Sequence, residues 1–290
     1  MPDSTHHTSS TRLGICSWSL RPHSARSLAT DVVAFGVRRV QLALDPIREN
    51  RPGWGEIETV NVLRAADIQI ASGMLATLGE DYATLESIAR TGGVRPDATW
   101  GRNLQAAQQN ARLARRLGIN LVTFHAGFIP HDSSAERDKL IRRLRQIVDI
   151  FDDCGVRVAL ETGQESAQTL LGALEELDRP YAGVNFDPAN MILYGMGDPI
   201  AALSVLAPRI AQVHIKDATP TKTPGTWGAE VAAGSGEVDW NKFFDALHAQ
   251  GFAGGMIVER ETGESRHADA IVARDLAGHH LRRIASGAAA

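Results

Sequence analysis

Short runs of β-branched and apolar residues alternate along the chain with longer segments whose apolar residues recur at helical spacing. The short runs predict eight strands, at residues 13–18, 38–44, 69–75, 121–127, 156–162, 182–188, 211–217 and 255–261. Most of these runs are continuously apolar, as expected of parallel strands that are covered on both faces. The alternation shows no break that resembles a linker between domains.

Amphipathic helices are predicted between these strands, at residues 25–36, 101–118, 136–155, 167–178, 240–251 and 267–285. Several of them close on a glycine directly before the next strand, as helices with a left-handed C-cap do: Gly36, Gly118, Gly155 and Gly251. The second unit is the weakest, because residues 59–67 offer only a short helix.

Eight βα units without a glycine-rich dinucleotide motif after the first strand favour a closed (β/α)8 TIM barrel over a doubly wound sheet. We expect residues 1–11 to form a flexible N-terminal tail and residues 12–290 to form a single barrel domain. In such a barrel the chemistry lies at the carboxyl ends of the strands, so the last residues of each strand are the informative ones.

The composition narrows the classes of function. The chain has 290 residues, of which 43% are hydrophobic, and a formal net charge of -4, which argues against a general nucleic-acid binder. Two cysteines, Cys16 and Cys154, are too few for a disulfide scaffold, and a reduced cytoplasmic setting fits best. We expect no membrane segment, because no apolar run reaches the roughly 18 residues that a span needs.

Four polar residues stand at the ends of the later strands, each directly after an apolar run: Glu161, Asp187, His214 and Glu259. They should converge at the mouth of the barrel, where three carboxylates would repel one another unless a cation lay between them. Oxygen ligands with one imidazole suit Mn²⁺ or Mg²⁺, and also Co²⁺, Fe²⁺ or Zn²⁺. The alternatives are a carboxylate site without metal and independent helix caps, and Asp187 before Pro188 fits a cap well.

The segments "VALETG", "GVNFDPAN", "VHIKDA" and "GMIVERE", in that order, resemble the sugar phosphate isomerase/epimerase family, which is built on a xylose isomerase-like TIM barrel. The resemblance implies that Glu161, Asp187, His214 and Glu259 bind one divalent metal ion, most often Mn²⁺. It also implies a carbohydrate substrate, with Glu161 and Glu259 removing and returning a proton next to a carbonyl group. A homo-oligomer is a further family expectation.

Further candidates for substrate binding lie near these strand ends. His125 ends the fourth strand, Lys216 shares a strand face with His214, and Trp18 at the end of the first strand could wall a sugar pocket. The plainer alternatives are a structural histidine, a solvent-exposed or ion-paired lysine, and a tryptophan that covers the barrel mouth by packing. Asn190 stands where many sugar 3-epimerases carry a histidine; it can hydrogen bond to substrate but cannot take a proton at neutral pH. Gln41 in the second strand is a weaker candidate of the same kind.

Residues 218–240 are rich in glycine, proline and threonine and predict a long irregular loop that covers the substrate, with Lys222 and Trp227 in it. A mobile surface insertion is the plainer alternative. Asp217 is expected to cap a loop, and Arg260 to pair between the barrel and its helices.

The sequence therefore predicts a metal-dependent isomerase or epimerase that acts on a sugar or a polyol-derived ketone. The nearest alternative is a metal-dependent lyase of the same fold, either a dehydratase or an enzyme that cleaves oxidised C-glycosides. An apurinic endonuclease and a non-catalytic sugar-binding barrel are less favoured, because the chain is acidic and all four ligand positions are filled.

Overall fold

The structure is a computed structural model that describes residues 12–286. The predicted tail at residues 1–11 lies outside the described residues, as do residues 287–290. Eight of its strands are β1 Leu13–Cys16, β2 Arg39–Ala43, β3 Gln69–Met74, β4 Leu121–Phe124, β5 Arg157–Glu161, β6 Gly183–Phe186, β7 Ile210–Ile215 and β10 Gly255–Val258. They form a closed parallel barrel in the order β1-β10-β7-β6-β5-β4-β3-β2, so the predicted strands and the (β/α)8 fold are confirmed.

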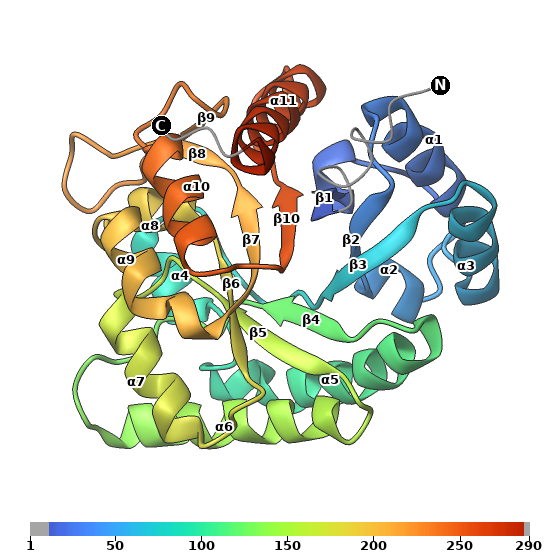
Figure 1. Cartoon of the computed structure of the whole chain (residues 1–290). Helices are drawn as coiled ribbons and strands as arrows, with labels where there is room; N and C mark the ends of the chain where they lie inside the picture. Colours follow the sequence, from blue (N-terminus) through green and yellow to red (C-terminus); the bar gives the residue numbers. More distant parts are fainter. Residues whose placement is uncertain (1–11, 287–290) are drawn as a thin grey trace, which may run out of the picture.

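The helices lie outside the ring of strands (Figure 1). They are α1 Ala25–Phe35, α2 Asp45–Arg48, α3 Glu56–Ala65, α4 Leu85–Thr91, α5 Asp97–Leu117, α6 Ala135–Asp152, α7 Ala167–Leu177, α8 Pro188–Leu193, α9 Pro199–Leu206, α10 Trp240–Ala249 and α11 Arg266–Ala285. Short 3-10 turns occupy Ser17–Leu20 and Ala207–Arg209. The four glycines predicted as C-caps all have φ between 66° and 85°, which is the left-handed conformation.

The second βα unit contains a longer helix than the sequence predicted. Helix α3 starts at Glu56, three residues before the predicted start, with Glu56 and Glu58 in its first turn. Negative side chains at this end are favourable because they face the positive end of the helix dipole.

The two faces of the strands differ in chemistry. Aliphatic and aromatic residues at alternate positions, such as Val158, Leu160 and Phe186, are buried in the core between strands and helices. The remaining positions of several strands point into the barrel and carry polar side chains that bond to one another, such as Gln41 and Gln212. The barrel interior is therefore a hydrogen-bonded layer beneath the mouth and not a second apolar core.

The segment predicted as an irregular loop contains a small antiparallel sheet. Strands β8 Asp217–Thr219 and β9 Ala229–Val231 pair with one another, at the end of the barrel toward which the arrows of β7 and β10 point (Figure 1). The Asp217 carboxylate fixes the chain that follows, since it accepts hydrogen bonds from the backbone N–H groups of Gly234, Gly236 and Val238 and from the indole N–H of Trp240.

Replacing Asp217 by asparagine should weaken the fold. Each carboxylate oxygen accepts at least two of these bonds, so in either orientation the new amide NH₂ faces N–H donors in a buried site. We expect Asp217→Asn to lower the free energy of unfolding by about 3 kcal/mol, measured by urea denaturation. Asp198→Asn is the control, because this exposed cap accepts one bond from Ala201. Equal losses in the two variants would contradict the prediction.

Candidate metal centre

Four side chains converge at the carboxyl ends of neighbouring strands. Glu161 ends β5, Asp187 follows β6, His214 lies near the end of β7 and Glu259 follows β10. One ligand atom from each lies within 4.8 Å of the others, and all four residues are buried. The sequence predicted this set, and the barrel brings it together.

The imidazole of His214 is the centre of the group. Its Nδ1 atom lies 3.3 Å from an Asp187 oxygen, 3.3 Å from a Glu259 oxygen and 3.5 Å from a Glu161 oxygen. Its Nε2 atom, on the other side of the ring, lies 2.8 Å from the side-chain oxygen of Gln41. A proton on Nε2 donated to Gln41 leaves a lone pair on Nδ1 aimed at the three carboxylates, as a metal-binding histidine requires.

A buried layer of amide side chains holds this orientation. Gln41 donates to the Thr123 hydroxyl at 2.8 Å and accepts from Gln212 at 3.0 Å, which fixes its oxygen toward His214. Asn185 donates to Glu161 at 3.1 Å and accepts from Gln212 at 3.1 Å. The register of β2 shifts beside Gln41 and that of β6 shifts beside Asn185, and such irregularities re-aim side chains.

Lys216 balances the charge of the carboxylates. Its ammonium lies 2.9 Å from Glu259, 2.6 Å from Glu261 and 3.7 Å from Asp187, and it donates to the Asn190 side-chain oxygen at 3.3 Å. Burial alone would favour a neutral lysine, but Glu259 and then Glu261 outweigh it and hold the Lys216 pKa well above its usual value.

The carboxylates respond differently to this environment. Burial opposes charge on Glu259, yet Lys216 and His214 hold its pKa well below the usual value. For Asp187 burial wins over Lys216, and the pKa is raised. Burial also opposes charge on His214, but Glu259 and its other neighbours raise the pKa well above the ordinary value. The raised pKa means that His214 holds an additional proton in the protein alone. A divalent cation bound at Nδ1 would compete with this proton, so the donor set fits a metal ion.

Asp187 has two roles in the structure. One of its oxygens accepts a hydrogen bond from the Asn190 backbone N–H at 2.9 Å and caps helix α8, and its second oxygen faces His214. The sequence offered a helix cap and membership of the carboxylate cluster as alternative roles for Asp187. In the structure Asp187 has both positions.

The predicted substrate-binding residues surround the same centre. His125 Nε2 lies 3.6 Å from Glu161, and Asn190 donates to Glu161 at 3.1 Å. Trp18, in the 3-10 turn after β1, donates its indole N–H to Glu259 at 2.8 Å. Their substrate contacts stay predictions.

The other residues from the same loops are placed as follows. Arg260 pairs with Glu230 of β9 and Asp269 of α11, between barrel and helices as expected. Lys222 is exposed between β8 and β9, whereas Trp227 packs on Tyr194 with ring centroids 4.8 Å apart.

Two functional candidates in the loop after β5 were not found from the sequence. Gln164 and Glu165 are both buried, and Gln164 donates to the Tyr194 hydroxyl at 3.4 Å. Among the described residues the Glu165 carboxyl group has no hydrogen-bond or ion-pair partner, and burial raises its pKa to about 8. Asn185 and Gln212 were also missed; a polar residue spaced by two from a predicted ligand along a strand is the signal that would reveal them.

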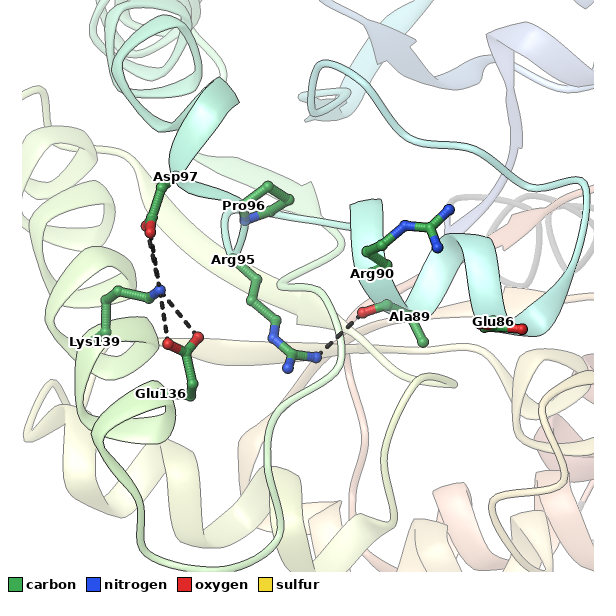
Figure 2. Close-up of a pocket in the computed structure, with 8 residues that line it drawn as sticks. All are labelled: Glu86, Ala89, Arg90, Arg95, Pro96, Asp97, Glu136 and Lys139. Atoms are coloured by element: carbon green, nitrogen blue, oxygen red, sulfur yellow. Dashed lines mark hydrogen bonds and ion pairs between the residues drawn. The ribbon is translucent and has the colours of Figure 1, made fainter.

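A hollow of about 510 Å³ on the surface among α4, α5 and α6 is separate from this centre (Figure 2). Several of its charged side chains have local partners, since Lys139 lies 3.0 Å from Glu136 and 3.2 Å from Asp97, and Arg95 donates to the Ala89 carbonyl at 3.2 Å. None of the strand-end residues lines it.

Comparison with known proteins decides the family. Residues 29–284 match the family model described as a xylose isomerase-like TIM barrel. The chain belongs to this family. It is similar to a xylose isomerase domain protein from Planctomyces limnophilus, with 30% identity, coverage of 95% of this chain and 97% of that chain, and a TM-score of 0.82.

Relatives within this family include named epimerases. A putative L-ribulose-5-phosphate 3-epimerase of Escherichia coli strain K12 is 27% identical over 183 residues, which are 60% of this chain and 63% of that protein. The match thus spans less than two thirds of that relative. A D-tagatose 3-epimerase-like protein has a TM-score of 0.73 at 16% identity, covering 95% of this chain and 99% of its own, and shows the shared fold. Among residues 12–286, no helix is long and apolar enough to cross a membrane.

Replacing the buried acid Glu165 should change how stability depends on pH. The folded carboxyl group keeps its proton to about pH 8, whereas the unfolded one ionises near 4.5, so the wild type loses stability as pH rises between these values. Glu165→Gln lacks this loss. We expect the free energy of unfolding of Glu165→Gln minus that of the wild type to increase from pH 5 to pH 8. The increase is at most roughly 5 kcal/mol, and the difference should stay constant above pH 8.

Urea denaturation across this pH range measures the difference. Glu175→Gln, at an exposed position of α7, is the matched control and should follow the wild type. A constant difference between Glu165→Gln and the wild type would show that the buried group is already ionised in the folded protein.

Proposed function

We propose that this protein is a divalent-metal-dependent isomerase or epimerase of a sugar or polyol-derived ketone. The observation that carries the proposal is the convergence of Glu161, Asp187, His214 and Glu259 on one point at the barrel mouth. The Escherichia coli relative is named as a putative L-ribulose-5-phosphate 3-epimerase, which supports this class of reaction.

Glu161, Asp187, His214 and Glu259 would hold the metal, for which Mn²⁺ is the favoured ion because three ligands are carboxylates and one is an imidazole. A bound ion would supply Lewis-acid polarisation of the substrate carbonyl, which makes the hydrogen on the adjacent hydroxyl-bearing carbon easier to remove.

Glu161 and Glu259 are the proposed proton carriers. In the ring of strands β5 and β10 are separated by β6 and β7, so the two carboxylates approach the His214 imidazole from opposite ends of a four-strand arc. One carboxylate removes the carbon-bound proton to give an enediolate, and the other returns a proton from its own side to give the epimer. Return of the same proton to the former carbonyl carbon, with transfer of the hydroxyl proton to the former carbonyl oxygen, gives the aldose/ketose isomer.

The remaining neighbours position these groups. Asn190 bonds to Glu161 and Lys216, Lys216 bonds to Glu259, and Trp18 bonds to Glu259, so each glutamate has a neutral or cationic partner that limits its orientation. We propose that the same side chains, with His125, bind substrate oxygens when the substrate lies between the two carboxylates.

Metal content tests the ligand set directly. After incubation with Mn²⁺ and dialysis, the wild type should retain roughly one equivalent of metal by elemental mass spectrometry, and His214→Ala should lose it. His248→Ala, at an exposed position of α10, should retain metal like the wild type. Retention of a full equivalent by His214→Ala would remove this histidine from the ligand set.

Proton exchange tests the reaction. On a panel of ketoses in deuterated water, Glu259→Gln should incorporate deuterium at the carbon next to the carbonyl about 10³-fold more slowly than the wild type, with its fold intact by circular dichroism. Glu175→Gln is the control. Full exchange in Glu259→Gln would exclude the proposed role, and a product with a new double bond or a released aglycone in place of an isomer of equal mass would identify a lyase.

A further inference from the structure

Aromatic side chains gather at the mouth of the barrel beside the metal centre. Trp227 packs edge-to-face on Tyr194, with centroids 4.8 Å apart, and stacks with Tyr82 at 6.5 Å. Phe128 also lies edge-to-face against Tyr194, with centroids 5.7 Å apart. These residues follow β3, β4, β6 and β8, so four separate loops contribute to one aromatic rim.

The rim is joined to the metal centre through the loop after β5. Gly163 lies two residues beyond Glu161, and a Cβ atom placed on it would stand 2.5 Å from the Asn190 Cβ and 3.2 Å from the Tyr194 ring. The next residue, Gln164, donates to the Tyr194 hydroxyl at 3.4 Å. The loop after β5 therefore lies against both Tyr194 and Asn190, and Asn190 bonds to Glu161.

Buried polar atoms at the rim have no partner in the protein. They are the indole N–H of Trp227, the side-chain oxygen of Gln164 and the Nδ1 atom of His125. The first is a donor and the second an acceptor, and hydroxyl groups satisfy both kinds of atom. A phosphate dianion carries acceptors alone and would leave the Gln164 oxygen unsatisfied.

The charged side chains at and beside the aromatic rim also disfavour binding of an anion. Lys216 is already held by Glu259 and Glu261, and Glu80 adds a further carboxylate that accepts from the Tyr82 hydroxyl at 3.1 Å. The Tyr82 side chain is 46% exposed, and desolvation on its covered side and then Glu80 raise its pKa, as expected of a phenol beside negative charge. A divalent ion together with Lys216 would bring three positive charges against the carboxylates of Glu161, Asp187, Glu259 and Glu261.

We propose that the substrate is an uncharged, hydroxylated ketone without phosphate, and that Tyr82, Tyr194, Trp227 and Gln164 form the subsite for its part distal to the metal. Aromatic faces pack against the C–H faces of a sugar or cyclic polyol, while Gln164 and the Trp227 N–H bind its hydroxyl groups. This inference rests on the proposed function and departs from the phosphorylated substrate named for the Escherichia coli relative.

Two arginines elsewhere on the mouth offer the competing interpretation. Arg21 follows the 3-10 turn after β1, and Arg266 begins helix α11 after β10, with a buried Nε atom that has no hydrogen-bond partner. Burial and the neighbouring Arg21 lower the pKa of Arg266. A phosphate group bound there would place the distal part of the substrate near α11 and away from the aromatic rim.

Matched pairs of ligands separate these interpretations. The probes are L-ribulose with L-ribulose 5-phosphate, and D-fructose with D-fructose 6-phosphate, added to the Mn²⁺-loaded full chain. The shift in melting temperature measures binding, and deuterium uptake measures turnover. We expect each free sugar to raise the melting temperature at a concentration at least tenfold lower than its phosphate ester.

Variants assign the effect to residues. Trp227→Ala should raise the free-sugar concentration needed for a given shift by about tenfold and leave metal content unchanged. Trp100→Ala, on α5 beside Arg143, is the matched control and should bind like the wild type. Glu261→Gln should narrow the difference between each free sugar and its ester, because one carboxylate charge is removed from the rim.

Different results would overturn the proposed subsite or the proposed activity. Stronger stabilisation by the phosphate esters, lost in Arg266→Ala, would overturn the inference, as would the absence of any shift by both free sugars. Binding of free sugars that depends on Trp227, without deuterium uptake, would uphold the subsite and overturn the proposed isomerase or epimerase activity.

Discussion

The structure depends on how three buried carboxylates are held around one imidazole. Glu161, Asp187 and Glu259 each bring an oxygen to within 3.5 Å of the same nitrogen of His214, in a place from which water is largely excluded. Buried charges of one sign are tolerated only when opposite charge and hydrogen bonds compensate for them. Lys216 and a proton on His214 do so in the protein alone, and a divalent cation does so more completely.

This constraint explains why the inside of the barrel is polar. If His214 were free to rotate, its lone pair would not stay aimed at the carboxylates, so the ring is held from below by Gln41. Gln41 in turn needs partners, which Thr123 and Gln212 provide, and Asn185 extends the layer to Glu161. Each member bonds to others of the layer, which is the condition under which a buried polar network orders a site.

The sequence predicted the barrel because its evidence is local. Apolar runs repeat in every unit and glycine caps such as Gly118 in several of them, and a residue at the end of a parallel strand must lie at the mouth once the ring closes. The amide layer was not predicted, because Asn185 and Gln212 sit within runs that look apolar and their partners are remote in sequence. The path of the chain after β9 was missed for a related reason, since Asp217 holds it through backbone donors at Gly234 and Val238 that no pattern of side chains reveals.

Reaction and substrate are decided in different parts of this fold. The centre belongs to strand ends, whose positions are fixed by the closed ring, and relatives with a similar barrel have names that imply different substrates. We propose that substrate choice belongs to the loops, where Tyr82, Tyr194 and Trp227 meet by contacts that the ring does not dictate. Because a loop aromatic replaces neither a proposed ligand nor a proposed proton carrier, a substitution in these loops would change substrate preference and leave the chemistry proposed for Glu161 and Glu259 the same.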